Sequence, residues 1–335
     1  MHKDKIRIWE EDEYNYPMAF GFVPHLMTYL HGDGSKGRPG IIVVPGGGYC
    51  VVSPTEGEIV AKKFYDMGFQ AFVLTYTTNL LMSVPLGKQP MKDLSRAIRY
   101  IRRHAEEYYL NPGQLAVCGF SAGGHLCGSI CVHYVDVIDE NAGYSDYSNR
   151  PDAAILAYPV ITSGEYAHQD SFKALLGMKY DEAVRKTICT ASEKELDYMS
   201  LEKHVTRNTP PCFLWQTATD ELVPVENSAL FAEACKKHNV PYAYHVFSEG
   251  QHGLSLADEK WASGEYGEPY TMEQSFAVIE AVKNGSLPMP EDAKRELMAQ
   301  FDFVKKQDIE IKANKEVEIW PKLAEYWLQE ILCCL

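Results

Sequence analysis

Short runs of apolar residues alternate along the chain with longer segments in which apolar residues recur at every third or fourth position. A strand buried on both faces reads as a nearly continuous apolar run, whereas a helix that covers it shows one apolar stripe. The alternation predicts an α/β fold with a mostly parallel central sheet flanked by helices. The predicted strands cover residues 41–44, 69–76, 115–118, 153–157, 212–215 and 243–247.

Helical spacing is clearest between the second and third of these strands. The pattern there ends before Asn111-Pro112-Gly113, and its apolar members are Met91, Leu94, Ile98, Ile101, Ala105 and Tyr108. Intervals of three and four residues place these side chains on one face of an amphipathic helix. Residues 224–238 and 317–332 predict two further helices, and the alternating residues 5–9 predict an antiparallel edge strand.

The alternation of strands and helices stops at about residue 262. Residues 266–314 contain glycine, proline and two helical patterns, and the last helix follows them. We therefore expect one domain, residues 1–335, with a C-terminal helical insertion at 266–314 before that helix. The apolar side chains of the insertion leave two alternatives open, a lid or a contact within a homo-oligomer; they are Met298, Phe301, Phe303 and Val304.

Composition and charge narrow the classes of partner. With 46% hydrophobic and 23% charged residues, the chain has the composition of a water-soluble globular protein. Its 32 basic and 46 acidic side chains give a net charge of −14, which argues against nucleic acid or an anionic membrane as a partner. The first 16 residues contain no apolar stretch typical of a signal peptide, so we expect a cytoplasmic protein.

The sequence gives no indication of a cofactor or a metal. The nine cysteines are odd in number and several lie in apolar runs, as reduced thiols do. Cys127 and Cys131 lie near His125, but zinc sites usually combine pairs of ligands from separate segments. The G-x-G-x-x-G pattern at 32–37 precedes a predicted strand instead of following one, so a dinucleotide site is not expected.

The segment Gly119-Phe120-Ser121-Ala122-Gly123 lies between a predicted buried strand and an apolar helix. This is the context of the G-x-S-x-G nucleophile elbow, a tight turn that strains the serine backbone and leaves room only for glycine on either side. The alternative is a glycine-rich turn without chemistry. We expect Ser121 to present its hydroxyl at the carboxyl end of the strand as a nucleophile.

Three consecutive glycines, Gly46-Gly47-Gly48, follow the first predicted core strand. Backbone amides of such a loop can approach a ligand closely, and an oxyanion hole needs converging N–H donors. A flexible connection explains one glycine well but three in a row poorly. We expect the amides of Gly47, Gly48 and Ala122 to form the hole, with Tyr49 at its rim as a substrate contact.

A serine nucleophile needs a base and an orienting carboxylate, which in hydrolases of this layout follow the serine in the order acid, then histidine. Of the eleven histidines, His252 directly follows the last predicted strand, so it is expected at the carboxyl edge of the sheet. Asp220 follows the preceding strand in the same way. The adjacent Glu221 is the alternative acid.

With these motifs at 45–49, 119–124, 217–228 and 250–253, the chain resembles the α/β-hydrolases. Within that fold it is similar to small acetyl esterases of the acetylxylan esterase and hormone-sensitive-lipase-like groups. Related lipases carry His-Gly-Gly-Gly where this chain has Pro45, so a role of that histidine does not transfer. The resemblance implies a serine carboxylic-ester hydrolase that works through an acyl-enzyme, without a cofactor.

The expected substrates are small-molecule or oligosaccharide esters. Our first interpretation is removal of O-acetyl groups from oligosaccharides derived from plant polysaccharides, with Trp261 as an aromatic contact for a sugar ring. A general short-chain or feruloyl carboxylesterase is the alternative. A ligand receptor of the same fold with an incomplete triad is a third class, but all three triad positions are occupied here.

Overall fold

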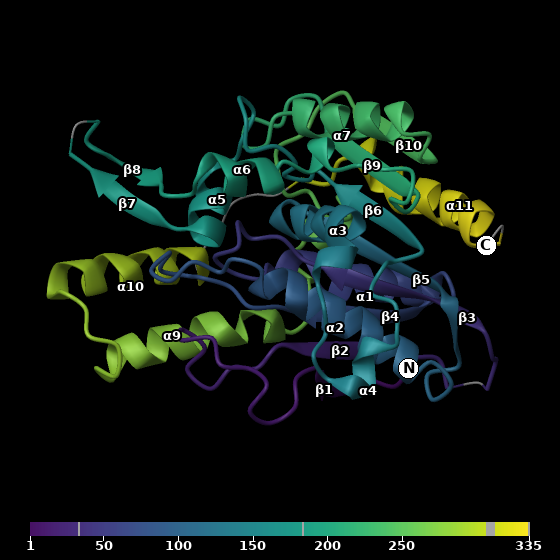
Figure 1. Ribbon diagram of the computed structural model, residues 1–335, viewed down its shortest axis with the longest axis horizontal. Coiled ribbons are helices and arrows are strands. Elements are labelled where there is room, and N and C mark those ends of the chain that lie inside the picture. The colour runs from purple at the N-terminus through teal and green to yellow at the C-terminus, as the bar shows by residue number, and fades with distance from the viewer. Residues whose placement is uncertain (33, 183, 306–311, 334–335) are drawn as a thin grey trace.

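The computed structural model describes residues 1–32, 34–182, 184–305 and 312–333, without the side chains of 300–305 and 333. Its centre is an eight-stranded sheet in the order β1-β2-β4-β3-β5-β6-β9-β10 (Figure 1). The pairs β1–β2 and β2–β4 are antiparallel, and all other pairs in this sheet are parallel. The strands are β1 (Lys5–Arg7), β2 (His25–Tyr29), β3 (Arg38–Val44), β4 (Gln70–Thr75), β5 (Leu110–Phe120), β6 (Ala153–Ala157), β9 (Cys212–Thr217) and β10 (Tyr242–Phe247).

The central strands are apolar on both faces because helices cover both. Every residue of β4, β6 and β9 is buried. The predicted α/β fold with a mostly parallel sheet is therefore confirmed. β5 begins at Leu110, five residues earlier than predicted, because its register with β3 shifts between the pairs Arg38–Leu110 and Gly40–Leu115.

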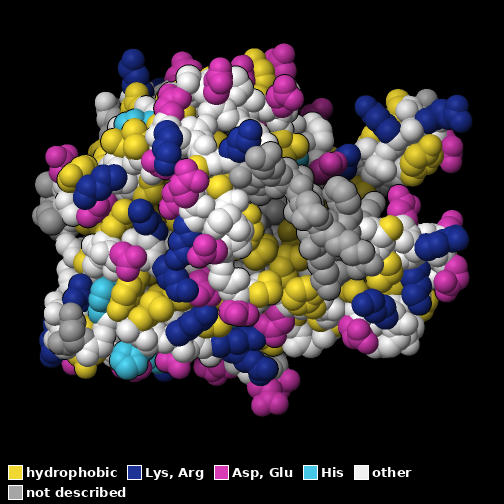
Figure 2. All heavy atoms as spheres, turned by 180° about the vertical axis from the view of Figure 1, so that it is seen from behind, with side chains coloured by type: hydrophobic (Ala, Val, Ile, Leu, Met, Phe, Trp, Pro, Cys, Tyr) yellow, Lys and Arg dark blue, Asp and Glu magenta, His cyan; other side chains and the backbone are white. Residues whose placement is uncertain are grey.

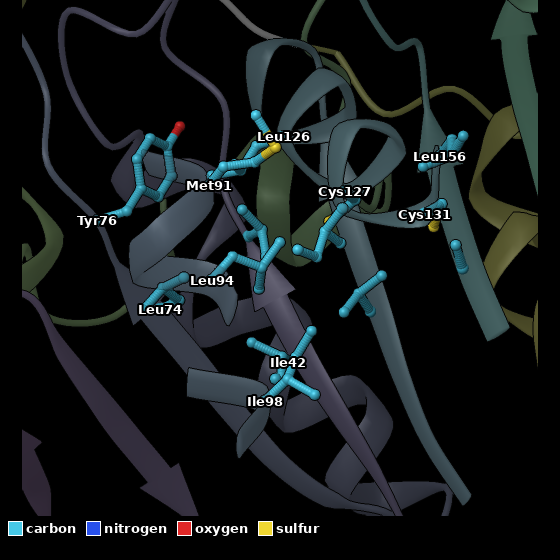
Figure 3. Packing of buried hydrophobic residues seen from close by; sticks show 14 of the residues in the cluster. Ile42, Leu74, Tyr76, Met91, Leu94, Ile98, Leu126, Cys127, Cys131 and Leu156 are labelled. Atoms are coloured by element: carbon cyan, nitrogen blue, oxygen red, sulfur yellow. The ribbon is translucent and has the colours of Figure 1, made fainter. Parts of the chain in front are cut away.

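One face of the sheet packs against α2 (Gln89–Arg103), α3 (Ala122–His133), α5 (Gln169–Leu176) and α7 (Glu226–Lys237). Figure 3 shows the strand residues Ile42 and Leu74 beside Leu94 and Ile98 of α2, with Leu126, Cys127 and Cys131 of α3 in the same cluster. The buried residues of α2 include Met91, Leu94, Ile98 and Ile101 of the predicted apolar stripe, but the helix ends at Arg103, so the prediction that it also contains Ala105 and Tyr108 was wrong. The 3-10 and short helices on the connections are η1 (Pro54–Glu56), η2 (Tyr134–Asp136), α4 (Ala142–Ser145), α6 (Glu193–Tyr198), η3 (Leu201–Lys203) and α8 (Glu259–Ala262).

The other face packs against α1 (Glu58–Asp66) and the C-terminal α11 (Trp320–Cys333), which follows η5 (Val317–Ile319). The indole of Trp320 stacks on that of Trp215 in β9 with ring centroids 5.4 Å apart, and its Nε1 donates to the carbonyl of Ser255 at 2.8 Å. The last helix thus supports both the sheet and the loop that follows β10.

Two segments extend beyond the sheet on the left of Figure 1. One is an antiparallel hairpin of β7 (Met178–Asp181) and β8 (Lys186–Cys189). This hairpin was not predicted from the sequence, since its side chains are exposed or half-buried and form no continuous apolar run. The other contains η4 (Tyr270–Met272), α9 (Glu273–Lys283) and α10 (Glu291–Lys305).

This second segment includes most of the predicted insertion. The carboxamide of Gln274 in α9 accepts from the Thr78 amide and donates to the Thr78 carbonyl, both at 2.8 Å, which fixes α9 at the end of β4. The side chains of Phe301, Phe303 and Val304 lie outside the described residues, and Met298 is half-buried. A lid or an oligomer contact at 266–314 stays a prediction.

The surface carries both signs of charge. Figure 2 shows acidic and basic side chains interspersed over the rear face, in keeping with the mixed composition. In the part of the chain that the structure describes, no helix is both long and apolar enough to cross a membrane.

Candidate active site

The predicted site residues come from the carboxyl ends of neighbouring parallel strands. Ser121 follows β5, Asp220 follows β9, and His252 follows β10. These ends meet at one edge of the sheet, where α/β proteins bind their ligands. Because β6 separates β5 from β9, the loop after β6 also reaches this edge.

Ser121 lies on a strained turn between β5 and α3, with φ 52° and ψ −118°. A Cβ on Gly119 would lie 2.2 Å from the carbonyl oxygen of Gly123, and one on Gly123 would lie 2.1 Å from that of Val44. Real Cβ atoms do not approach backbone this closely, so both positions require glycine. The turn has the geometry expected of a nucleophile elbow.

The structure brings the three predicted side chains of the triad together. The Oγ of Ser121 lies 2.8 Å from Nε2 of His252, and Nδ1 of His252 lies 2.7 Å from Oδ2 of Asp220. The imidazole of His252 therefore lies between the two other residues, with one ring nitrogen at the serine hydroxyl and the other at the carboxylate. This arrangement allows the imidazole to take a proton from the serine while the carboxylate holds its orientation.

Of the two acids left open by the sequence, Asp220 occupies the position beside the histidine. Its second oxygen, Oδ1, accepts the backbone amides of Leu222 at 3.0 Å and Val223 at 2.9 Å. The carboxylate is thus buried and held on both sides. Glu221 is exposed and lines the groove outside.

The glycine loop after β3 lies directly against the nucleophile. A Cβ on Gly46 would lie 2.9 Å from Cβ of Ser121 and 2.6 Å from the carbonyl oxygen of Phe120. Gly47 and Gly48 have φ values of 120° and 63°, which glycine adopts without strain. Within the described ranges, no partner is recorded for the amides of Gly47, Gly48 or Ala122. These three amides are available to a ligand at the elbow.

Two expected substrate contacts are wrong. Tyr49 is only 2% exposed; its φ of 62° turns the ring inward, and its hydroxyl lies 2.7 Å from Nδ1 of His125. Burial lowers the pKa of His125 to about 4, so this pair is a neutral contact of the core. Trp261 is also 2% exposed and packs against the apolar face that α11 covers. Neither ring lines the site.

Two residues near the site were missed by the sequence analysis. The Cε1 of His168 lies 4.0 Å from where a Cβ of Gly48 would be, and its Nδ1 lies 2.8 Å from Oγ of Ser171. Burial lowers the pKa of His168, which keeps the ring neutral. The second is Glu56, whose buried carboxylate accepts the amide of Gly46 at 2.7 Å. Neither directly follows a predicted core strand or lies in one of the motifs that pointed to the other candidates.

A groove of about 740 Å³ opens beside His252. It is lined by residues of the loops after β9 and β10, namely Thr219, Glu221, Leu222, Glu249, Gly250, Gln251 and His252. The hydroxyl of Thr219 and the carboxylates of Glu221 and Glu249 can hydrogen-bond a ligand in this groove.

No group of three or more His, Cys, Asp or Glu residues able to hold a metal ion occurs among the described residues. Cys127 and Cys131 are buried in the core between α3 and the sheet. Burial raises the pKa of Cys127 well above its ordinary value, so this thiol keeps its proton.

Comparison with known proteins adds family information to this geometry. Residues 26–235 match the family model BD-FAE. The chain is 50% identical over 275 residues to endo-1,4-beta-xylanase B of Butyrivibrio fibrisolvens, which covers 81% of this chain and 41% of that protein. It is 30% identical over 227 residues to an acetylxylan esterase of Xylanibacter ruminicola, which covers 64% of this chain and 41% of that protein. The chain thus spans about four-tenths of the length of these relatives.

A solved structure agrees with the fold. The acetyl ester-xyloside bifunctional hydrolase from Caldicellulosiruptor lactoaceticus has a TM-score of 0.67 and 37% sequence identity to this chain. The match covers 84% of this chain and 96% of that protein.

Proposed function

Because the chain belongs to the BD-FAE family of α/β-hydrolase esterases, we propose that it hydrolyses carboxylic esters and that its substrates are acetyl esters of xylose-based oligosaccharides. One observation carries the chemical part of the proposal. The Oγ of Ser121 lies 2.8 Å from Nε2 of His252, whose Nδ1 lies 2.7 Å from Asp220. A serine so paired is an activated nucleophile for acyl transfer.

In the proposed reaction, Ser121 Oγ attacks the acetyl carbon while His252 Nε2 takes the serine proton. The carbonyl oxygen becomes an oxyanion that accepts the amides of Gly47, Gly48 and Ala122. Asp220 stabilises the imidazolium. When the tetrahedral intermediate collapses, the carbon–oxygen bond to the sugar breaks and the imidazolium protonates the departing sugar oxygen.

The acetyl group is now bound to Ser121, and water completes the cycle. His252 takes a proton from a water molecule, whose oxygen attacks the acetyl carbon in the same oxyanion hole. The imidazolium then returns the proton to Ser121 Oγ as acetate leaves. Ester and water are consumed, and alcohol and acetic acid are formed.

Two findings support an acetylated sugar as substrate. A relative is an acetylxylan esterase, and a structural neighbour is an acetyl ester-xyloside hydrolase. The polar groove beside His252 lies where the alcohol part of the ester could leave the triad, and it can hydrogen-bond sugar hydroxyls. A general short-chain or feruloyl esterase is the second candidate, because the open groove imposes no narrow limit on the alcohol.

The decisive experiment measures product release from three substrates. We expect acetate from acetylated xylo-oligosaccharides with a kcat/KM well above that for feruloylated arabinoxylo-oligosaccharides. Deacetylated xylan should give no new reducing ends, even though one relative is a xylanase. The matched control is Ser121→Ala, which should lose nearly all acetate release with an unchanged circular dichroism spectrum.

Preference for feruloyl esters would support the second candidate and reject the acetyl one. Acetate release that survives Ser121→Ala would refute the proposed mechanism as a whole. Release of reducing ends from deacetylated xylan would show a glycosidase activity that the triad does not explain.

A further inference from the structure

A buried carboxylate connects the glycine loop to the loop of the histidine. The Oε2 atom of Glu56 accepts the amide of Gly46 at 2.7 Å, and Oε1 accepts the hydroxyl of Tyr158 at 2.7 Å. The same hydroxyl accepts the amide of Ser255 at 3.0 Å. Ser255 lies three residues after His252, so one chain of hydrogen bonds spans both halves of the site.

The directions of these bonds fit an ionised Glu56. Burial raises the pKa of Tyr158 well above its ordinary value, so its hydroxyl keeps its proton and donates it. With the Gly46 amide also donating, both carboxylate oxygens act as acceptors. Burial is the largest influence on the pKa of Glu56 and leaves it above its ordinary value, although these two bonds and the nearby imidazole of His252 lower it.

The surroundings leave these groups little freedom. Glu56 is 4% exposed, and the ring of Tyr158 packs edge-on against His252 with centroids 4.9 Å apart. The hydroxyl of Ser255 donates to the carbonyl of Thr55 at 2.8 Å, which ties the histidine loop to the residue next to Glu56. A buried charge that is fully hydrogen-bonded in this way orients its partners strongly.

The glycine loop also depends on this carboxylate. The carbonyl of Gly46 accepts the amide of Ser53 at 3.0 Å, and the carbonyl of Pro45 accepts the hydroxyl of Tyr76 at 2.8 Å. The Gly46 amide is the remaining polar group of this stretch, and Glu56 fixes its direction. Fixing this peptide restricts the start of the loop whose next two amides, those of Gly47 and Gly48, we assign to the oxyanion hole.

We propose that Glu56 is a positioning residue, which through Gly46 sets the oxyanion-hole loop and through Tyr158 sets the loop of His252. It touches no reacting atom. The inference requires esterase activity of the Ser121 site but not a particular sugar or acyl group. The test of Glu56 is therefore independent of whether the substrate is an acetylated sugar.

The test compares Glu56→Ala, Glu56→Gln and Tyr158→Phe with the matched control Glu58→Gln. Glu58 is also buried, but its partners are Lys3 and Lys62. Turnover of 4-nitrophenyl acetate gives kcat and KM, and inhibition by a short-chain trifluoromethyl ketone reports the oxyanion hole, because its adduct places an oxyanion there. Melting temperatures separate loss of stability from loss of position.

For Glu56→Ala we expect kcat to fall on the order of 10² to 10³-fold, as for loss of one oxyanion donor, with KM within about threefold. Inhibition by the ketone should weaken in parallel. Glu56→Gln keeps one acceptor oxygen and should recover part of the loss, with a kcat about three- to tenfold below that of wild type. Tyr158→Phe should lower kcat by about tenfold, and Glu58→Gln should leave both readouts unchanged.

Several outcomes would overturn the proposal. One is a kcat of a folded Glu56→Ala or Glu56→Gln within twofold of wild type. Another is a fall in kcat with unchanged inhibition by the ketone, since the hole would then be intact. If Glu56→Ala does not fold, the Glu56→Gln and Tyr158→Phe variants decide by the same criteria, and an equal loss in Glu58→Gln would also refute it.

Discussion

Replacement of Asp220 by asparagine should disable the triad without disturbing its shape. In the carboxylate, Oδ1 accepts two backbone amides, those of Leu222 at 3.0 Å and Val223 at 2.9 Å. Two N–H donors at this position require an acceptor, so the asparagine oxygen must take the place of Oδ1. Its NH₂ group must then take the place of Oδ2, 2.7 Å from Nδ1 of His252.

This orientation forces the wrong tautomer on the histidine. Nδ1 of His252 has to accept a hydrogen bond from the new amide, so the ring proton moves to Nε2. Nε2 lies 2.8 Å from Oγ of Ser121, where it must be unprotonated to act as the base. In serine hydrolases with a Ser-His-Asp triad, this substitution lowers kcat about 10⁴-fold, which corresponds to about 5.4 kcal/mol of activation free energy.

The assay is steady-state hydrolysis of 4-nitrophenyl acetate near neutral pH. We expect kcat of Asp220→Asn to fall by about 10⁴ while KM changes little, because the ester does not contact this side chain. The melting temperature should be nearly unchanged, since all backbone partners are kept. Labelling of Ser121 by a fluorophosphonate should slow in parallel.

The neighbouring Glu221→Gln is the matched control, because Glu221 is exposed and the sequence alone left it as the alternative acid. We expect its kcat within twofold of wild type. The tautomer argument is wrong if Asp220→Asn keeps more than a tenth of wild-type turnover, or if Glu221→Gln loses as much as Asp220→Asn.

Three further predictions concern the loop, the substrate and stability. Gly46→Ala should lower kcat at least 10²-fold, because its Cβ would lie 2.6 Å from a backbone oxygen, whereas Gly113→Ala near the start of β5, at the opposite end of the strand from Ser121, should be neutral in the same assay. We expect the ring of His168, which lies beside Gly48, to contact the sugar and not the acetyl group, so His168→Ala should raise KM for acetylated xylo-oligosaccharides several-fold but change 4-nitrophenyl acetate hydrolysis little; equal effects on both esters would reject this contact. The hydrogen bond from Arg96 lowers the pKa of Glu13 from 4.5 to about 2. The ionised Glu13 carboxylate therefore stabilises the folded state above about pH 4.5, and this stabilisation is lost as the pH falls toward 2. Glu13→Gln should therefore lower the free energy of unfolding by about 1–2 kcal/mol at pH 7, after allowance for solvent screening. Urea titrations of wild type and variant should show this difference shrinking toward pH 2, and a difference that stays constant with pH would contradict the lowered pKa of Glu13.

The order of motifs along the chain was enough to predict which side chains meet. Ser121, Asp220 and His252 each directly follow a strand, and carboxyl ends of parallel strands meet at one edge whatever the details of packing. The strand bounds were less accurate, because β5 begins before its apolar run. The hairpin of β7 and β8 was missed, since exposed strands lack the apolar pattern.

Side-chain direction was harder to predict than position. Tyr49 follows the glycine loop as expected, but a backbone in the left-handed region turns its ring into the core. Trp261 was expected to contact a sugar ring, yet its short helix α8 presents the indole to the interior. Glu56 gave no local signal, because its partner Tyr158 lies 102 residues away in the sequence.

The three triad residues follow strands that differ in how firmly they are held in the sheet. β5 and β9 lie inside the sheet, whereas β10, which precedes His252, is an edge strand, and most of its side chains are half-buried or exposed. Peripheral elements detach at lower free energy than a whole domain unfolds. Heating should therefore abolish activity some degrees below the melting temperature of the domain. Activity should return fully on cooling after brief warming, because the rest of the sheet stays folded and β10 can pair with it again.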